Sequence, residues 1–563
     1  MNGEVNTRMV VPANVDSLES RKSRGAFFTP PEVCAFITSW AVREPRDVIL
    51  EPACGEAAFL LSAGARLREL NRDQAYAAGQ LRGFDLHTES VLAARATMRT
   101  AHLPAEVSAG DFLSLEAAPT CDAVIGNPPY VRYQGFTGDA RLRGRAAASR
   151  AGVALTGLAS SWAAFTVHAA SFLKTDGRLG LVLPAELLFV NYAADIRRFL
   201  MERFARIRLI LFAERVFPGV LEEVILLLAE GDGPTDHCEL HQINNLGELA
   251  QIGGHGRHYT PFAPSDKWTP GLVSDEATSI LAGAAATGAF AALSDWGETT
   301  LGMVTGNNSY FALSPARAAQ LGLTRSDLLT ISPPGSRHLR RLSFTGADWR
   351  ARGDAHERTL LFRPHGEPSA AGLAYIAAGE ATGVDTAYKC RVRSPWWRVP
   401  LLPPADLLLT YMNADTVRLC TNEAAAHHLN SVHGVYLRAD FQHTGARLLP
   451  LATLNSLTLL GAELVGRGYG GGLLKLEPRE ADQLPVPSHD ALLAASPALE
   501  KARPLVDHAL AQGRLLEAVA TVDEILLSGH LGMSHMQVQT VSEARAQLAE
   551  RRRTRGRRPR VTN

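Results

Sequence analysis

Short apolar runs alternate with amphipathic stretches along the chain from about Val48 to Glu230. This alternation is the pattern of strands joined by crossover helices over a largely parallel sheet. We therefore expect an α/β domain in this part of the chain. The predicted strands are Val48–Leu50, Leu81–Asp85, Ala123–Ile125, Leu179–Leu183, Ile207–Phe212 and Val224–Leu228.

The periodicity fades between Gly231 and about Pro270, where glycine, proline and histidine become frequent, and this change indicates a domain boundary. Mixed apolar runs and turns follow, and a proline-rich exit at 484–487 leads into helical sequence. The expected organisation is an N-terminal extension (1–20), an α/β domain (21–240), a linker (241–292), a second, mixed α/β domain (293–490), a helical segment (491–550) and a basic, disordered tail (551–563).

The composition is that of an ordinary globular protein. Of 563 residues, 46% are hydrophobic, and 57 Lys and Arg balance 57 Asp and Glu. No apolar run approaches the roughly 18 residues of a membrane-spanning helix, and Met1 to Arg21 lacks the apolar stretch of a signal peptide. The six cysteines are scattered without a CxxC pair, so we expect reduced thiols and a cytoplasmic protein.

The most informative motif is Gly126-Asn127-Pro128-Pro129-Tyr130, which directly follows the predicted strand that ends at Ile125. Ligands of open α/β sheets bind at the carboxyl ends of strands. Two prolines stiffen the loop and remove two amide donors. The Asn127 side-chain oxygen and the Pro128 carbonyl can both accept from one amino group, and Tyr130 offers a flat surface for a planar ring. These residues suit an aminated nucleobase, although such a peptide is by itself also a common turn.

Three turns upstream suit a nucleotide-like ligand. Val48 to Leu60 contains a strand, a turn of small residues and the start of a helix, but neither a GxGxxG fingerprint nor a P-loop is present. The next strand ends in Asp85, and an acid at a strand tip can bind ribose hydroxyls. Asp111-Phe112 adds another acid and a ring. Taken singly, an Asp in such a position is more often a turn or helix-capping residue, and it is the order and spacing of these residues that favour a ligand site.

In this order, the motifs resemble those of the TaqI-type, gamma-class adenine-specific amino-group DNA methyltransferases, and the resemblance extends over nearly 490 residues. It implies a Rossmann-like class I methyltransferase domain with a mostly parallel sheet, followed by a C-terminal mixed α/β target-recognition domain. It also implies S-adenosylmethionine as the cofactor, without a metal. The residues implied in cofactor binding are Thr29 (at the methionine part), Glu51, Ala53, Gly55, Asp85 (at the ribose), Asp111 and Phe112 (at the adenine ring).

The resemblance makes Asn127, Pro128 and Tyr130 the catalytic residues, with Phe217 as a second ring against a flipped-out adenine. Adenine N6 is a poor nucleophile, so two acceptors on its N–H groups and correct orientation towards the methyl group are the expected activation. The base must leave the duplex to reach such a pocket. One departure from the family is Ala57, where many relatives have glycine; we expect negative φ there and a modest change in the loop.

The second domain is expected to bind duplex DNA. Residues 331–400 contain eleven Lys and Arg against six Asp and Glu. Arginine serves both phosphate contacts and guanine recognition, although a single arginine is more often a solvated surface charge or a phosphate contact than a base reader. The basic tail can add nonspecific phosphate affinity. The DNA-binding candidates are Arg337, Arg340, Arg341, Lys389, Arg391 and Arg393.

Other functions remain open at this stage. Asn-Pro-Pro-Tyr also occurs in methyltransferases of protein glutamine and of RNA, although those chains are usually much shorter. A catalytically silent DNA-binding or specificity subunit would have no reason to keep Asn127, Tyr130, Glu51 and Asp85 together. No nuclease cluster is evident, so any cognate restriction endonuclease of a restriction-modification or related defence system is expected to be a separate chain. We expect a monomer.

Overall fold

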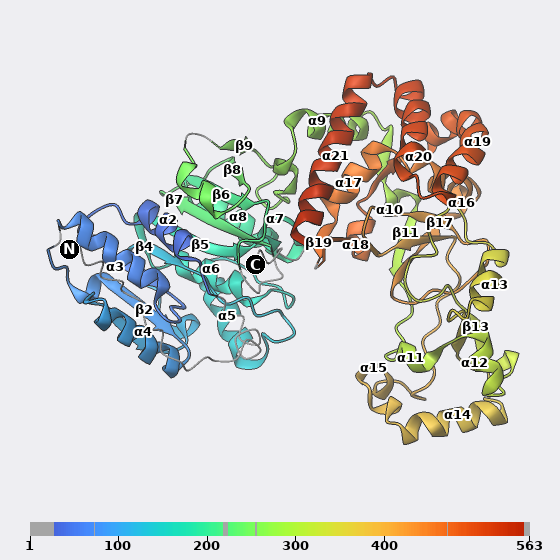
Figure 1. The fold of residues 1–563 in the computed structure, drawn as a ribbon, viewed down its shortest axis with the longest axis horizontal. Coiled ribbons are helices and arrows are strands. Elements are labelled where there is room, and N and C mark those ends of the chain that lie inside the picture. Colours follow the sequence, from blue (N-terminus) through green and yellow to red (C-terminus); the bar gives the residue numbers. More distant parts are fainter. Residues whose placement is uncertain (1–27, 73, 218–222, 254–255, 470, 557–563) are drawn as a thin grey trace, which may run out of the picture. The chain divides into compact units, whose positions relative to one another are not determined.

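The structure is a computed structural model, and it describes residues 28–72, 74–217, 223–253, 256–469 and 471–556. The chain divides into two compact units, residues 1–271 and 272–563 (Figure 1). The predicted N-terminal extension (1–20) lies outside the described residues.

The first unit is built on a nine-stranded sheet in the order β3-β2-β1-β4-β5-β7-β6-β8-β9. The pairs among β3, β2, β1, β4 and β5 are parallel, whereas β7 runs antiparallel to both β5 and β6. All six predicted strands are present, and the expected Rossmann-like fold is confirmed. The strands are β1 (Ile49–Glu51), β2 (Leu81–Asp85), β3 (Glu106–Ala109), β4 (Cys121–Gly126), β5 (Leu173–Pro184), β6 (Arg206–Phe212), β7 (Val224–Glu230), β8 (Cys238–Ile243) and β9 (Arg257–Tyr259).

Helices pack along this sheet (Figure 1). Apolar side chains such as Ile37, Leu60 and Val182 fill the space between helices and strands and are fully buried. Burial of these side chains is the main stabilising contribution to the unit. The helices of the unit are α2 (Pro31–Ala41), α3 (Ala58–Leu70), α4 (Thr88–Thr100), α5 (Gly138–Arg150), α6 (Ser161–Ala170), α7 (Glu186–Phe189) and α8 (Ala194–Arg203).

The strand order brings the predicted motifs to one edge of the sheet. β1 pairs with β2 on one side and with β4 on the other, all in parallel. Connections from these neighbouring strands therefore diverge at their carboxyl ends, which is where open α/β sheets bind ligands. A β-carbon placed on Gly126 would lie 3.6 Å from Glu51 Cγ, so the end of β4 lies against the end of β1.

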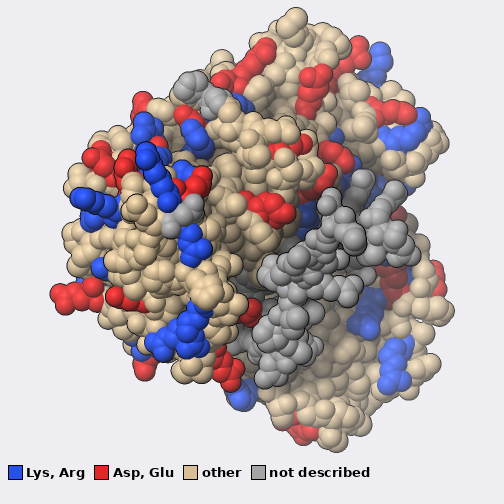
Figure 2. Space-filling view, turned by 60° about the vertical axis from the view of Figure 1, so that its left-hand side comes forward, with Lys and Arg blue, Asp and Glu red and all other residues tan. Residues whose placement is uncertain are grey.

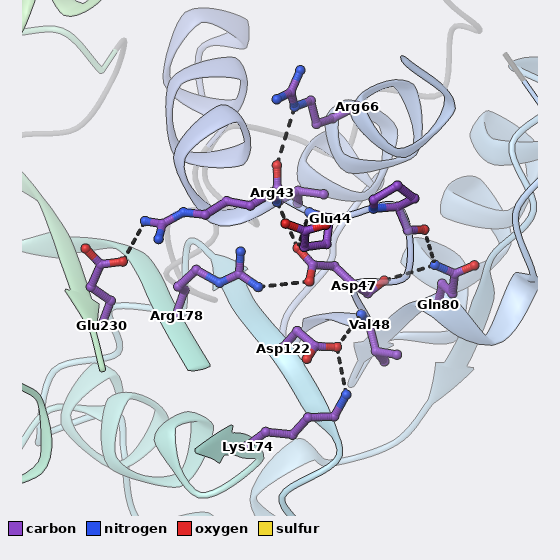
Figure 3. A network of polar contacts seen from close by, with 12 residues as sticks. Arg43, Glu44, Asp47, Val48, Arg66, Gln80, Asp122, Lys174, Arg178 and Glu230 are labelled. Carbon is purple, nitrogen blue, oxygen red and sulfur yellow. Dashed lines mark hydrogen bonds and ion pairs between the residues drawn. The ribbon is translucent and has the colours of Figure 1, made fainter. Parts of the chain in front are cut away.

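On the side of the amino end of β1, a buried ion pair joins Asp47 and Arg178 (Figure 3). Arg178 Nη2 lies 2.9 Å from Asp47 Oδ1. The other carboxylate oxygen accepts from the backbone N–H groups of Arg43 and Glu44, at 2.8 and 3.1 Å. A second carboxylate, Asp122, joins Lys174 to the N–H of Val48. This network ties the loop before β1 to β4 and β5.

The second unit contains four smaller sheets, among the residues that the structure describes. Their strand orders are β10-β21, β11-β18-β15-β17, β12-β14-β13 and β16-β20-β19. The strands are β10 (Phe290–Ala292), β11 (Gly297–Leu301), β12 (Ala312–Leu313), β13 (Leu328–Thr330), β14 (Leu360–Phe362), β15 (Leu407–Thr410), β16 (Met412–Asn413), β17 (Leu419–Thr421), β18 (Val432–Leu437), β19 (Arg467–Tyr469), β20 (Leu473–Lys475) and β21 (Pro485–Pro487).

Along the chain, helices lie before, between and after the strands of these sheets (Figure 1). The mixed α/β architecture agrees with the expectation for the second domain. The helices are α9 (Asp275–Ala286), α10 (Leu293–Trp296), α11 (Asn308–Phe311), α12 (Pro315–Gln320), α13 (Gly346–Asp354), α14 (Ala370–Ala381), α15 (Tyr388–Arg391), α16 (Gln442–Ala452), α17 (Ser456–Val465), α18 (Pro478–Ala481), α19 (His489–Ala511), α20 (Leu515–Val522) and α21 (His535–Gly556).

The boundaries differ from those expected in two places. The segment expected to be a linker, 241–292, is divided between the units at 271/272, because β8 and β9 extend the first sheet and α9 begins the second unit. The expected tail is also different: α21 continues to Gly556, and Arg552 is buried within the second unit. The expectation of a disordered tail is therefore wrong for 551–556, and 557–563 lie outside the described residues.

Among the described residues, no single helix is long and apolar enough to cross a membrane. Two consecutive helical segments, 439–452 and 456–465, have that length and apolar composition only when taken together, and they are bent by 91° at the break between them. The second segment, α17, is almost entirely buried in the second unit, as expected for a core helix.

Candidate active site

The loop that follows β4 carries the predicted catalytic residues. Asn127 Nδ2 donates to Thr29 Oγ1 over 3.1 Å. Thr29 is itself 5% exposed and immediately precedes Pro30, the N-cap of α2. Because the amide nitrogen faces Thr29, the orientation of the amide is defined, and Oδ1 is its acceptor end. Pro128 is buried. The structure therefore brings together Thr29, Asn127 and Pro128.

The two predicted aromatic residues share an apolar neighbourhood. Tyr130 donates from its hydroxyl to the Val182 carbonyl over 3.0 Å, which ties the ring to β5. Its ring packs against the same apolar cluster that contains Phe217, and Phe217 is 2% exposed. The residues that follow Phe217, 218–222, lie outside the described part of the chain.

The turn between β1 and α3 is built around a buried carboxyl group. Glu51 is 3% exposed, and its Oε2 accepts from the N–H of Leu60 in the first turn of α3, at 3.0 Å. Burial, followed by the nearby charge of Asp85, holds the pKa of Glu51 well above its usual range. Ala53 lies half-buried in the same turn. The buried Glu51 side chain thus holds this turn against the start of α3 through its hydrogen bond with Leu60.

Ala57 departs from our expectation. Its φ is +71° and its ψ is 34°, in the left-handed region, at the residue that precedes α3. The expectation of negative φ at Ala57 is wrong: the loop keeps the conformation that glycine adopts easily, and the alanine carries a strain of about 1 kcal/mol. Gly55 also has positive φ, +49°, and no atom lies within 4 Å of a β-carbon placed on it.

Asp85 ends β2 and bonds to the glycine turn. Its Oδ2 accepts from the N–H of Gly55 at 2.9 Å, and its Oδ1 accepts from the N–H of His87 at the same distance. The Cys54 N–H donates to the carbonyl of Phe84 at 2.9 Å. The predicted ribose-binding acid and the predicted glycine turn are therefore adjacent.

Asp111 and Phe112 follow β3, and the Gly110 N–H donates to the Asp85 carbonyl. Asp111 Oδ1 accepts from the N–H of Leu113 at 3.0 Å, and Oδ2 pairs with Arg143 Nε of α5 at 2.6 Å. The ring of Phe112 is 2% exposed and packs on Phe165, His168 and Phe172. Sequence reasoning missed Arg143, which lies 32 residues from Asp111.

Sequence reasoning also missed the start of α6, which contacts the loop that carries the predicted catalytic residues. Ser161 hydrogen-bonds to Pro129 and Val131. The adjacent Ser160 lies 3.2 Å from the hydroxyl of Tyr192, which also lies 2.5 Å from Glu186 Oε2. Two serines before an apolar run are a helix-start signal, but that signal does not identify which loop they contact.

The predicted DNA-binding residues of the second unit fall into two groups. Arg340 pairs with Asp415 at 2.6 Å, Arg341 binds the carboxylate of Asp507, and Arg393 donates to the carbonyls of Val304 and Thr305. These three side chains are thus engaged within the unit. Arg337, Lys389 and Arg391 are exposed.

The charge on the surface of the first unit is mixed. On the face that comes forward in Figure 2, basic and acidic side chains are interspersed. Some arginines of this unit have acidic partners on the same helix, as in Arg66–Glu69 and Arg198–Asp195, both at 2.7 Å. Such exposed pairs contribute little to stability.

Two family models match the chain in succession. Residues 16–252 match the N-6 DNA methylase family, and residues 265–527 match the C-terminal domain of the type II methyltransferase M.Eco57I. Together with the strand-end motifs, these matches decide the family. The chain belongs to the N6-adenine DNA methyltransferases. It is a DNA methyltransferase that uses S-adenosylmethionine, so the expected family, activity and cofactor are confirmed.

Two curated relatives cover most of the chain of this N6-adenine DNA methyltransferase. The type II methyltransferase M.AccI of Acinetobacter calcoaceticus is 21% identical over 83% of the chain and 86% of its own length. M.XamI of Xanthomonas campestris pv. amaranthicola is 25% identical over 86% of the chain and 89% of its own length. Among solved structures, the type IIL restriction-modification enzyme MmeI in complex with DNA has a TM-score of 0.60, with 11% identity over 92% of this chain and 75% of that chain. This last similarity concerns the fold.

The residues at the carboxyl edge of the sheet fit the cofactor of this N6-adenine DNA methyltransferase. β-carbons placed on Gly55 and Gly110 would meet no atom within 4 Å, so a ligand can approach the backbone of both turns closely. The Asp85 carboxylate at a strand tip suits ribose hydroxyls. The acidic Asp111 and the cluster of rings around Phe112 suit a planar amine-bearing base.

Proposed function

We propose that the enzyme methylates N6 of an adenine that is flipped out of duplex DNA at a specific sequence, with Asn127 Oδ1 and the Pro128 carbonyl as the two acceptors for the amine. The observation that carries this proposal is the hydrogen bond from Asn127 Nδ2 to Thr29 Oγ1. It turns the acceptor end of the amide away from Thr29 and so prepares it for an N–H donor.

S-adenosylmethionine, when bound, supplies a methyl group that its sulfonium makes electrophilic. The contribution of the protein is to hold the adenine amine in line with that methyl group. Two acceptors on the two N–H groups draw the nitrogen towards a tetrahedral geometry and direct its lone pair. The prolines of the loop limit its motion, so these acceptors are arranged before the base arrives.

The flipped base needs flat surfaces, because unstacking it from the duplex costs a few kcal/mol. Tyr130 is the first proposed surface, since its hydroxyl bond to Val182 fixes the ring plane at the end of β5. Phe217 is the second, since it belongs to the apolar cluster on which Tyr130 packs.

Cofactor binding is proposed for Thr29, Glu51, Ala53, Gly55, Asp85, Asp111 and Phe112. Asp85 holds the turn through the Gly55 N–H and offers its carboxylate to ribose. Glu51 is proposed to support the site from within the protein. Its buried carboxyl group accepts a hydrogen bond from the N–H of Leu60 and so fixes the first turn of α3.

The second unit, residues 272–563, is proposed to bind and read the DNA. Arg337, Lys389 and Arg391 are exposed and can make phosphate or base contacts. Arg340, Arg341 and Arg393 are proposed to shape that surface through their contacts within the unit. We further propose a monomeric, cytoplasmic modification enzyme of a restriction-modification or related defence system, with any cognate endonuclease on a separate chain.

The test is transfer of labelled methyl groups from S-adenosylmethionine to DNA from a host that lacks adenine methylation. The proposal predicts label in N6-methyladenine and its loss in Asn127→Ala, with cofactor affinity largely kept. Asn244→Ala, at an exposed asparagine of the same unit, is the matched control and keeps activity. Label in cytosine, RNA or protein would reject the substrate, and an active Asn127→Ala would reject the mechanism.

A further inference from the structure

Helix α6 begins directly against the catalytic loop. Ser161, its first residue, is 2% exposed. Its Oγ donates to the Pro129 carbonyl and accepts from the N–H of Val131 at 2.9 Å. Its own N–H donates to the Val131 carbonyl at 3.0 Å. One side chain and one amide thus make three hydrogen bonds to the loop.

The loop depends on outside donors because of its composition. Pro128 and Pro129 have no N–H, so the loop offers carbonyls but lacks the amide donors with which a turn usually fixes itself. Thr29 contacts the side chain at the start of the loop, Asn127. Ser161 contacts the backbone at its other end, and Pro128 lies between the two contacts. The Ser161 hydroxyl therefore limits where the Pro128 carbonyl can lie.

The start of α6 is itself firmly held. The Trp162 side chain, fully buried, donates from Nε1 to the hydroxyl of Tyr192 at 3.1 Å. The same hydroxyl lies 2.5 Å from Glu186 Oε2 and 3.2 Å from Ser160 Oγ. Burial and the nearby Glu186 charge raise the pKa of Tyr192 well above its usual value, so it stays protonated and donates to Glu186. Ser161 accordingly projects from a fixed support.

We propose that Ser161 is a positioning residue for methyl transfer: through Pro129 and Val131 it sets the place of the acceptors on Asn127 and Pro128 without contacting substrate or cofactor. This inference rests on the proposed function. Small displacements of an acceptor from its in-line arrangement slow a reaction strongly. Ser161 should therefore affect the chemical step far more than either binding step.

The experiment measures single-turnover methyl transfer to unmethylated genomic DNA with the full-length protein in excess. For Ser161→Ala we expect the rate to fall by roughly 10- to 100-fold, while the affinities for S-adenosylmethionine and DNA change by less than about threefold. Ser161→Thr keeps the hydroxyl and should recover most of the rate. Ser171→Ala is the matched control, because Ser171 follows the same helix at its far end and bonds only weakly, to the Val167 carbonyl at 3.4 Å.

The outcomes separate this role from the proposed function. Absence of adenine label with the natural protein would overturn both. If Ser161→Ala labels adenine at the rate of the natural protein, only the role of Ser161 is overturned. Equal slowing in Ser161→Ala and Ser161→Thr would overturn that role as well. If Ser161→Ala does not fold, Ser161→Cys keeps the side-chain volume with a weaker donor; slowed transfer supports the proposal, and an unchanged rate rejects it.

Discussion

Asn127 and Thr29 are joined by one hydrogen bond although 98 residues separate them in the sequence. The bond runs from the amide nitrogen of Asn127 to the hydroxyl of Thr29, and Thr29 immediately precedes the Pro30 cap of α2. A residue proposed to contact the cofactor therefore also orients the amide that is proposed to be catalytic. Through this pair, the proposed cofactor site is linked to the proposed acceptor for the adenine amine.

Thr29→Val should slow methyl transfer more than it weakens cofactor binding. The substitution keeps the shape of the side chain but removes the acceptor, so the amide of Asn127 is no longer held in one orientation. We expect a fall in the single-turnover rate of roughly 10- to 100-fold. Thr29→Ser retains the hydroxyl and is expected to stay near the natural rate.

Cofactor affinity, measured by calorimetry, is the control for this prediction. If Thr29 served only the methionine part of the cofactor, Thr29→Val would weaken binding and saturating S-adenosylmethionine would restore the full rate. That outcome would contradict an orienting role. Persistent slowing at saturation would support it.

Arg178→Met should lower the free energy of unfolding by about 3 kcal/mol or more. The ion pair with Asp47 is buried, with side chains 9% and 5% exposed, and removal of the guanidinium leaves a buried carboxylate with only its two backbone donors (Figure 3). Denaturant unfolding of the full chain measures the change.

The double variant Arg178→Met with Asp47→Asn tests the cause. It removes the uncompensated charge and retains an acceptor for the N–H groups of Arg43 and Glu44, so it should be more stable than Arg178→Met alone. An equal or larger loss in the double variant would show that packing, rather than charge, dominates at this edge of the sheet.

The local sequence was sufficient to predict the parts of the fold that depend on contiguous residues. The apolar runs 179–183 and 224–228 are long and lie in the sheet centre, and both predicted strands are present. β3, β8 and β9 were not predicted, because Glu106–Ala109 is mostly exposed and β8 alternates polar residues. The Asn-Pro-Pro-Tyr loop was located correctly because it directly follows a buried strand.

Contacts between residues that lie far apart in the chain could not be predicted from the sequence. The basic run around Arg340 and Arg341 predicts DNA-binding residues. Their carboxylate partners lie 75 and 166 residues away in the sequence, so these ion pairs could not be predicted from the run itself. Ser161 lies 32 residues after Pro129 and carried no local sign of contact with it. At Ala57 the side-chain preference for negative φ was overridden, because the turn between β1 and α3 fixes the backbone.

Arg552→Met should destabilise the second unit, by about 3–5 kcal/mol. Arg552 and Glu463 form a pair with side chains 6% and 3% exposed, 2.7 Å apart, and Arg552 also donates to the carbonyls of Gly472 and Asp415. The neighbouring Arg553, 50% exposed and paired with Glu550 on the same helix, is the matched control; Arg553→Met should change stability by less than about 1 kcal/mol. Unfolding in denaturant distinguishes the two, and equal effects would contradict a structural role for Arg552.

His168 should make the protein less stable as the pH falls below 7. Its ring is 1% exposed and packs on Phe112 and Phe172, with Nε2 3.1 Å from the Phe112 carbonyl. Burial, followed by the charge of Arg150, lowers the pKa of His168 to about 4 in the folded chain, whereas the ordinary value is 6.5. Between these two values the unfolded chain binds the proton more readily, so stability contributed by neutral His168 is present above pH 6.5 and is lost as the pH falls towards 4.

The variant His168→Phe keeps an aromatic ring beside Phe112 but cannot take up a proton. The stability of the variant minus that of the natural protein should therefore be higher at pH 5 than at pH 7. Loss of the bond to the Phe112 carbonyl lowers the stability of the variant by the same amount at both pH values, so it does not affect this comparison. Thermal unfolding midpoints of both proteins at the two pH values give this difference directly, because groups that titrate in both proteins cancel. If the difference between the variants were independent of pH, His168 would not be held neutral by its surroundings. Since Phe112 is the ring proposed to lie at the cofactor, a pH-dependent loss of cofactor affinity in the natural protein, absent from the variant, would further show that this buried histidine supports the cofactor site.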